Sequence, residues 1–294
     1  MIHHYTISNK RPYNEDRFII KTNANPDPVL ESYENMAVIG VCDGHGGHEI
    51  STHVSEVLGD YFITKHIATD NTPQPTKKYN SYIIDIFDLI QNEMNAKHQK
   101  STDQGTTVSI VLLYNHGTKK YITAINSGDS RSMACNKSLI AQSLTKDHKP
   151  NYATERKRIE SAGGVITSDT NTHRINGVLA VSRSLGDFDT KQFIEYRPDI
   201  YHYENDYHYV LVASDGLWDV LSSDDVNEII LTTIYENPTW ITKEVDTKRD
   251  NVAAIVAQAA IDKGSEDNIT VVIYFFTTVA EEYFNSKNTF YTNI

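Results

Sequence analysis

Three apolar runs of this 294-residue sequence each end in a carboxylate beside a glycine. The three endings are Asp43-Gly44, Gly128-Asp129 and Asp215-Gly216. A single Asp-Gly step at a strand end is ordinary turn chemistry. Three such steps at the ends of neighbouring buried strands would instead gather like charges, and that repulsion favours bound cations. The spacing therefore predicts one carboxylate cluster.

Four further carboxylates accompany these endings, with few Lys or Arg residues between them. They are Glu15 and Asp16 in the first segment, Asp219 one helical turn after Asp215, and Asp267 just before the last apolar run. Carboxylate and carbonyl oxygens suit Mg or Mn, whereas zinc prefers His and Cys ligands. The composition of the cluster therefore predicts a Mg or Mn site.

A histidine follows the first ending directly. The ordinary pKa of histidine lies near neutrality, so His45 is predicted to transfer protons. His45 and His48 stand three residues apart, which leaves a zinc site on one helical turn as an alternative, although no third His or Cys has a matching spacing. A plain helix-start position is the other interpretation of His45 and the favoured one for His48.

Strands are needed to bring these side chains together. Short runs of β-branched and aromatic residues between turn residues predict strands at 36–42, 107–114, 121–125, 209–214 and 269–276. Apolar residues at helical spacing predict helices over 50–62 and 82–94, a third over 252–263 ending at Gly264, and a fourth after Ser222-Ser223. Clustered strands with amphipathic helices predict a layered α+β sandwich.

One domain over 1–294 is expected, because no repeat or long linker divides the chain. The stretch 149–193 is more polar than its surroundings and predicts an irregular flap lobe. Arg174 and Arg183 lie in this lobe without a run of carboxylates beside them, so they are expected to help select substrates. The segment 281–294 is expected to be a short tail.

Net charge and cysteine content restrict the class of protein. The formal net charge of −12 argues against a nucleic-acid partner, which requires a basic face. Cys42 and Cys135 lie in apolar runs and indicate reduced thiols in an intracellular compartment, the cytoplasm or nucleus. The sequence shows no signal pattern, and its longest apolar stretch, 271–280, is shorter than the ~20 residues of a membrane span. A monomer without membrane contact is expected.

Taken in chain order, these motifs resemble the metal-dependent protein phosphatases of type 2C. The resemblance extends over about residues 8 to 277 and rests on the segments Arg11–Asp16, Asp43–Gly47, Gly105–Thr107, Asn126–Arg131, Asp147–Pro150, Ala162–Gly164, Arg174–Asp187, Ser214–Asp219 and Asp267–Asn268. It implies a four-layer α-β-β-α sandwich, in which two antiparallel sheets are flanked by helices. That expectation agrees with the layered α+β prediction.

The resemblance also implies a set of metal ligands. Asp43 would bridge two Mg or Mn ions, with the Gly44 carbonyl assisting at one of them. Asp215 and Asp267 would hold the other ion. Glu15 and Asp16 would bind directly or through water. Asp129 and Asp219, together with Asp215, would hold a third and weaker ion.

Other residues receive roles beside the metals. Arg11 would pair with the substrate phosphate through its planar guanidinium. Thr106, Thr107 and Asn268 would orient the carboxylates by hydrogen bonds. His45 would protonate the leaving oxygen. The implied reaction is hydrolysis of phosphoserine and phosphothreonine in proteins, by a metal-bridging hydroxide that attacks phosphorus directly and forms no phospho-enzyme.

Alternative chemistries lack their motifs. A cysteine-dependent phosphatase needs Cys-x5-Arg, but the sixth residue after Cys42 is His48 and the sixth after Cys135 is Ala141. Glycine-rich kinase loops and P-loops are also missing from the sequence. The alternative from another class is a catalytically inactive binding or scaffold protein with the phosphatase fold. Such a protein would be expected to have lost metal ligands that this chain retains.

Overall fold

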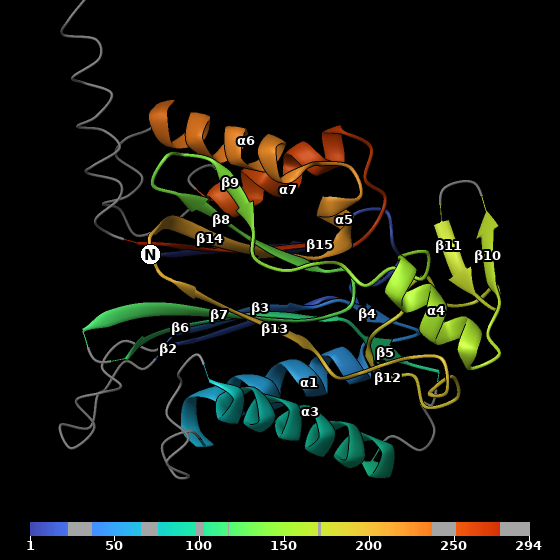
Figure 1. The fold of residues 1–294 in the computed structure, drawn as a ribbon. Helices are drawn as coiled ribbons and strands as arrows, with labels where there is room; N and C mark the ends of the chain where they lie inside the picture. The colour runs from blue at the N-terminus through green and yellow to red at the C-terminus, as the bar shows by residue number, and fades with distance from the viewer. Residues whose placement is uncertain are drawn as a thin grey trace, which may run out of the picture.

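Two five-stranded antiparallel sheets face each other at the centre of the protein (Figure 1). The computed structural model describes residues 1–22, 37–65, 76–97, 103–116, 118–169, 172–236 and 251–276. The first sheet has the order β1 (Ile2–Ile7), β15 (Ile269–Phe275), β14 (Tyr207–Ala213), β8 (Arg131–Asn136) and β9 (Ala141–Ser143). The second has the order β13 (Asp199–Glu204), β7 (Lys119–Ser127), β6 (Val108–His116), β3 (Ala37–Cys42) and β2 (Arg17–Thr22).

Helices cover the outer face of each sheet (Figure 1). On the first sheet lie α6 (Ser223–Glu236) and α7 (Val252–Asp262), with the short α5 (Asp215–Trp218) at one end. On the second lie α1 (Glu49–Asp60), which continues as the π-helical turn η2 (Tyr61–Lys65), and α3 (Lys77–Lys97). The predicted four-layer sandwich is therefore confirmed. The predicted tail 281–294 lies outside the described residues.

Three apolar layers hold the sandwich together. One packs the first sheet against α6 and α7, and includes Leu211, Val256 and Val271. Another packs the second sheet against α1 and α3. The layer between the sheets joins Ile39 and Val111 to residues of β14 and β15. Each buried aliphatic side chain contributes about 1.5–3 kcal/mol, so these layers give the strand ends a rigid base.

The sequence patterns located five central strands, but they missed the central strand β8 and the edge strands. All five predicted strands are present within a few residues, and α7 ends before Gly264, whose φ of +95° suits glycine. Helix α6 begins with a reciprocal cap, in which Ser222 Oγ accepts from Asp225 N and Asp225 Oδ2 accepts from Ser222 N. The outer strands β1, β2 and β13 were missed because their residues are only partly buried.

The flap lobe is more regular than predicted. It contains α4 (Ala153–Ser161) and a hairpin of β10 (Ile166–Asp169) and β11 (Thr172–Ile175). Ile159, Ile175, Phe193 and Ile194 form a separate small core beneath these elements. A hydrophobic cluster with its own helix and hairpin explains the order, so the prediction of an irregular lobe is wrong in this respect.

A small third sheet lies where the lobe meets the main body. It has the order β12 (Leu185–Gly186), β5 (Gly105–Thr106) and β4 (Gly44–His45). Figure 1 places it, together with α5, at the end of the molecule that carries the lobe. None of the helices in the described ranges is long and apolar enough to cross a membrane.

Candidate active site

The predicted carboxylates meet where the two central sheets end. Asp43 follows β3 of the second sheet, and Asp215 follows β14 of the first. Asp129 lies on the crossing from β7 in one sheet to β8 in the other. Asp16 precedes β2, whose Arg17 pairs with Cys42 directly before Asp43. The cluster therefore spans both sheets at their shared end.

The carboxylates of this cluster interact mainly with one another. Burial is the main cause that raises the pKa of Asp43, and the nearby charges of Asp215, Asp16 and Asp129 raise it further. Asp43 and Asp215 also share a side-chain hydrogen bond. Burial raises the pKa of both Asp16 and Asp129 to about 6. Carboxyl groups prefer their neutral form in such surroundings.

Two buried oxygens of the cluster lack hydrogen-bond partners. Asp16 Oδ2 accepts from Ser214 Oγ at 2.8 Å, but Asp16 Oδ1 has no partner in the described part of the chain. Asp129 Oδ1 is likewise without a partner there. An unsatisfied buried acceptor costs about 1–3 kcal/mol. An oxygen-ligated divalent cation would satisfy these atoms, so the donor set fits Mg or Mn.

The carboxylates are near one another without forming a finished coordination shell. Within the described ranges no three His, Cys, Asp or Glu side chains form a group that is geometrically ready to hold a metal ion. Zinc coordination by His45 and His48 finds no support, because His45 bonds to Asp187 and His48 lies exposed at the start of α1.

Glycines allow close backbone approaches around the cluster. A Cβ at Gly44 would lie 2.6 Å from the Glu15 carbonyl oxygen, which also accepts a hydrogen bond from Ser51 Oγ. A Cβ at Gly216 would lie 1.9 Å from the Asn268 carbonyl oxygen. Side chains at either position would push the first segment or the start of β15 away from the cluster.

Asn268 fixes the first segment by three hydrogen bonds. Its Oδ1 accepts from Glu15 N at 2.8 Å, and its Nδ2 donates to the carbonyls of Ser8 and Tyr13 at 3.1 and 2.9 Å. The side chain thus orients the backbone that carries Glu15, whereas the sequence predicted contact with carboxylates.

The threonines also differ from that prediction. Thr107 N donates to the Asp43 carbonyl at 2.8 Å, and Thr107 Oγ1 bonds Ser130 Oγ at 2.7 Å. Thr107 therefore positions the backbone of Asp43. The hydroxyl of Thr106 donates to the Thr107 carbonyl and reaches no carboxylate of the cluster.

His45 is held by an aspartate that the sequence interpretation missed. His45 Nε2 donates to Asp187 Oδ2 at 2.8 Å across the small third sheet. Gly105 lies between them, and a Cβ there would be 2.2 Å from Asp187 Oδ2. Burial lowers the pKa of His45, but Asp187 outweighs burial and the net shift is upward. The available signal was Gly186-Asp187, another Gly-Asp step in the chain.

Arg11 reaches the edge of the cluster. Its guanidinium donates to Asp267 Oδ2 at 2.6 Å and remains largely exposed. Asp267 Oδ1 accepts from the backbone N of Asn268. A cation at the solvent-facing rim of a carboxylate cluster is suitably placed to bind an anion such as phosphate.

Lys149 is a second cation that the sequence interpretation did not assign. Its Nζ donates to Asp219 Oδ1 at 2.8 Å and lies 3.8 Å from Asp129 Oδ2. Burial lowers the pKa of Lys149, but Asp129 and Asp219 outweigh it and raise the pKa above the ordinary value. The sequence predicted that a third metal ion would connect Asp129 and Asp219. In the structure the Lys149 ammonium connects them.

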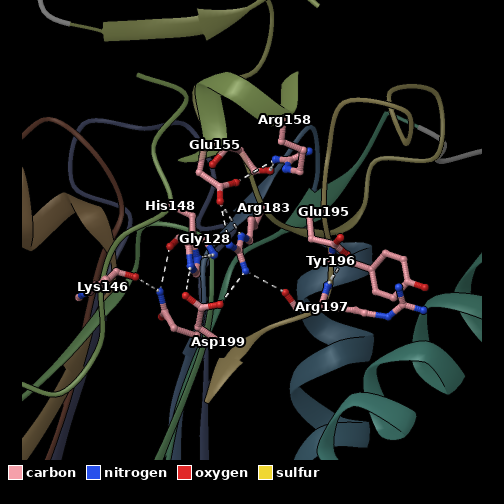
Figure 2. A network of polar contacts seen from close by, with 12 residues as sticks. Gly128, Lys146, His148, Glu155, Arg158, Arg183, Glu195, Tyr196, Arg197 and Asp199 are labelled. Atoms are coloured by element: carbon pink, nitrogen blue, oxygen red, sulfur yellow. Dashed lines mark hydrogen bonds and ion pairs between the residues drawn. The ribbon is translucent and has the colours of Figure 1, made fainter. Parts of the chain in front are cut away.

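The two lobe arginines have different surroundings, and Figure 2 shows those of Arg183. Arg183 Nη2 donates to Glu155 at 2.8 Å, and Arg183 Nη1 donates to Asp199 at 3.0 Å. No run of carboxylates stands beside Arg183 in the sequence, and α4 and β13 bring these two partners to it from elsewhere in the chain. Arg174 is exposed and donates to the Val178 carbonyl.

His148 connects this network to the cluster (Figure 2). Its Nδ1 accepts from Gly128 N at 3.1 Å, so Nε2 carries the proton and donates to Asp199 at 3.1 Å. That hydrogen bond is the main cause that lowers the pKa of Asp199. Gly128 precedes Asp129 in sequence, so the network supports the loop that presents Asp129.

Comparisons with known proteins agree with the resemblance seen in the sequence. The family model for Protein phosphatase 2C matches residues 6–269. The chain is 33% identical over 273 residues to "Probable protein phosphatase 2C 52" of Oryza sativa subsp. japonica, covering 91% of this chain and 48% of that protein. It is 32% identical to "Protein phosphatase 1L" of Bos taurus, covering 92% of this chain and 71% of that protein.

Solved structures share the fold at lower identity. A phosphatase from a pathogenic strain of Toxoplasma gondii aligns with a TM-score of 0.75 at 21% identity, covering 94% of this chain and 92% of that one. A C. elegans sex determining protein aligns with a TM-score of 0.78 at 23% identity, covering 97% of this chain and 66% of that one. The chain spans about half to two thirds of the length of the first curated relatives.

Proposed function

Because the chain belongs to the protein phosphatase 2C family, we propose that it hydrolyses phosphoserine and phosphothreonine in proteins with the help of Mg or Mn ions. The observation that carries this proposal is the gathering of Asp16, Asp43, Asp129 and Asp215 at one end of both sheets, with buried oxygens left unpaired. Divalent cations with oxygen ligands stabilise such an arrangement.

In this proposal Asp43, Asp215 and Asp267 hold two ions, with the Gly44 carbonyl, Glu15 and Asp16 completing the oxygen donors. Asp129 and Asp219 contribute, with Asp215, to a third and weaker site. When bound, Mg or Mn supplies a Lewis acid that makes water nucleophilic at neutral pH and neutralises phosphoryl charge. Direct attack of water on phosphorus follows from this chemistry, without a phospho-enzyme.

Arg11 binds the phosphate in this proposal. Its guanidinium already lies at the rim of the cluster, 2.6 Å from Asp267 Oδ2, and its exposure leaves donors free to face a substrate. A planar guanidinium can bind two phosphate oxygens at once. Arg11 would therefore orient the phosphoryl group for in-line attack.

His45 protonates the leaving serine or threonine oxygen. Asp187 engages Nε2, so the ring keeps its orientation and delivers the proton from Nδ1. The Ser184 hydroxyl donates to Asp187 and fixes that carboxylate in turn. An alkoxide is a poor leaving group, and its protonation typically contributes ~10²–10⁴-fold to the rate.

The proposal extends to the surroundings in which the protein works. Both cysteines are free and buried, which supports a reducing intracellular compartment such as the cytoplasm or nucleus. Phosphorylated proteins are the proposed partners. A monomer is proposed because the site is assembled within one chain.

Phosphate release tests this function. Phosphoserine, phosphothreonine and phosphotyrosine peptides of one sequence would be incubated with the purified chain, with Mn²⁺ and then with EDTA. We expect release from the first two peptides that depends on the metal. If Mn²⁺ binds but no peptide is hydrolysed, the chain would instead be a binding or scaffold protein with the phosphatase fold.

A further inference from the structure

One ammonium group forms ion pairs with two carboxylates at the edge of the cluster. Lys149 Nζ lies 2.8 Å from Asp219 Oδ1 and 3.8 Å from Asp129 Oδ2. The side chain of Asp129 is only 5% exposed, whereas that of Asp219 is 56% exposed. Asp129 Oδ1 is also buried and has no hydrogen-bond partner within the described ranges. The ammonium therefore partly neutralises a buried carboxylate that retains one unsatisfied oxygen.

The backbone on both sides of Lys149 is fixed, so the position of its side chain is part of the fold. Asp147 accepts two hydrogen bonds from Arg131, at 2.8 and 2.7 Å, and that guanidinium lies 5.1 Å from the ring centroid of Trp218. His148 N donates to the Gly128 carbonyl at 2.9 Å. Lys149 O accepts from Tyr152 N in the turn that leads into α4.

We propose that the Lys149 ammonium is a built-in cation between Asp129 and Asp219, and that a third divalent ion binds there only by displacing it. The inference rests on the proposed metal-dependent function, because the third ion belongs to the same site. An ion and the ammonium between the same two carboxylates would repel each other, and the partly exposed Asp219 offers little charge to offset that repulsion. The lysine thus sets the weakness of the third site.

The same contact ties the flap lobe to the main body. Lys149 is the first residue of the lobe, and Asp219 lies at the end of α5. Displacement of the ammonium by an ion would break this tie while leaving the His148 and Arg131 contacts in place. Binding of an ion at the third site would therefore be coupled to release of Lys149, the first residue of the lobe, from the main body.

Titration calorimetry with Mn²⁺ on metal-free protein tests the competition. Lys149→Met keeps the length of the side chain and removes its charge, so its weakest site should bind at least about tenfold more tightly than in the wild type. Lys149→Arg keeps the charge and should stay close to the wild type. Lys21→Met is the matched control. Lys21 forms a 2.7 Å ion pair with Asp60 and lies near the end of β2 that is remote from the carboxylate cluster.

Thermal unfolding in EDTA supplies a second measurement. Lys149→Met should melt at a lower temperature than the wild type, because Asp129 loses its only cation among the described residues, and excess Mg²⁺ should remove the difference. Lys149→Gln would replace Lys149→Met if the latter did not fold. Equal affinities of the weakest site in the wild type and the uncharged variants would overturn the inference.

These measurements are independent of hydrolysis. If the wild type released no phosphate from any peptide, the proposed function would fail, while the titration would still show whether Lys149 excludes an ion.

Discussion

Two groups of carboxylates in this protein have opposite electrostatic surroundings. In the carboxylate cluster, formed by Asp16, Asp43, Asp129 and Asp215, burial and like charges raise the pKa of every member. In the lobe network, formed by His148, Glu155, Arg158, Arg183 and Asp199, partners alternate in charge (Figure 2). There the pKa values of Glu155 and Asp199 are lowered.

The contrast separates two uses of buried charge. Glu155 is 4% exposed, yet hydrogen bonds from Arg183 and Arg158 outweigh the cost of its burial. The carboxylates of the lobe network are therefore compensated by cations and a histidine of the network itself. In the carboxylate cluster Lys149 compensates Asp129 only in part, and the pKa of every member stays raised. A fold retains that kind of strain where an external cation completes the site. Metal removal should distinguish the two regions.

The largest effect is expected from Asp43→Ala. Loss of a bridging carboxylate should lower metal-dependent phosphatase activity by more than the ~10–100-fold that loss of a ligand's orienting partner costs. Removal of one like charge should also raise the melting temperature of the metal-free protein. A metal-free variant that melted clearly below the metal-free wild type would contradict the description of the cluster as mutually repelling.

His45→Gln tests the boundary between the two regions, because Asp187 of the lobe holds His45 of the main body. Activity on a phosphothreonine peptide should fall ~10²–10⁴-fold, since glutamine cannot protonate the alkoxide. Activity on p-nitrophenyl phosphate should change by less than about threefold, because nitrophenolate leaves without a proton. Equal losses on both substrates would assign His45 a purely structural role.

Arg183→Met tests the self-sufficiency of the lobe network. Glu155 and Asp199 keep Arg158 and His148 as partners, so we expect a loss of about 2–3 kcal/mol in the free energy of unfolding, below the usual cost of breaking a buried pair. Arg156→Met is the matched control, because the exposed Arg156–Glu160 pair on α4 should contribute less than about 0.5 kcal/mol. Urea denaturation with saturating Mg²⁺ measures both variants.

The last effect is a dependence of stability on pH. In the metal-free protein Asp16 and Asp129 have pKa values near 6, so between about pH 4 and 6 the folded state binds more protons than the unfolded chain. The free energy of unfolding should therefore rise by about 2–3 kcal/mol from pH 7 to 5, measured relative to an Asp16→Asn/Asp129→Asn variant. An unchanged difference would count against the raised pKa values.

The contribution of the lobe network to the free energy of unfolding depends on pH with the opposite sign. The lowered pKa values of Glu155 and Asp199 stabilise the folded state above about pH 4 and lose that contribution as the pH falls further. From pH 7 to 5, the free energy of unfolding of the metal-free wild type should therefore rise relative to that of the Asp16→Asn/Asp129→Asn variant. The free energy of unfolding lost in Arg183→Met should stay constant over that interval.

The sequence predicted the cluster because its signal is local. Asp43, Asp129 and Asp215 each follow an apolar strand, and strand ends in layered sheets meet at one place. The lobe network carries no comparable signal, since Glu155, Arg183 and Asp199 become neighbours only through α4 and β13. Lys149 and Asp187 were missed for the same reason, as each finds its partner across the main body and the lobe.

If divalent cations complete the carboxylate cluster, the metal-free wild-type protein must bind them. Equilibrium dialysis against Mn²⁺ counts the bound ions. We expect at least two ions per chain, loss of binding in Asp43→Ala and an unchanged count in Arg183→Met. No bound Mn²⁺ in the wild type, or equal binding in Asp43→Ala, would contradict this expectation.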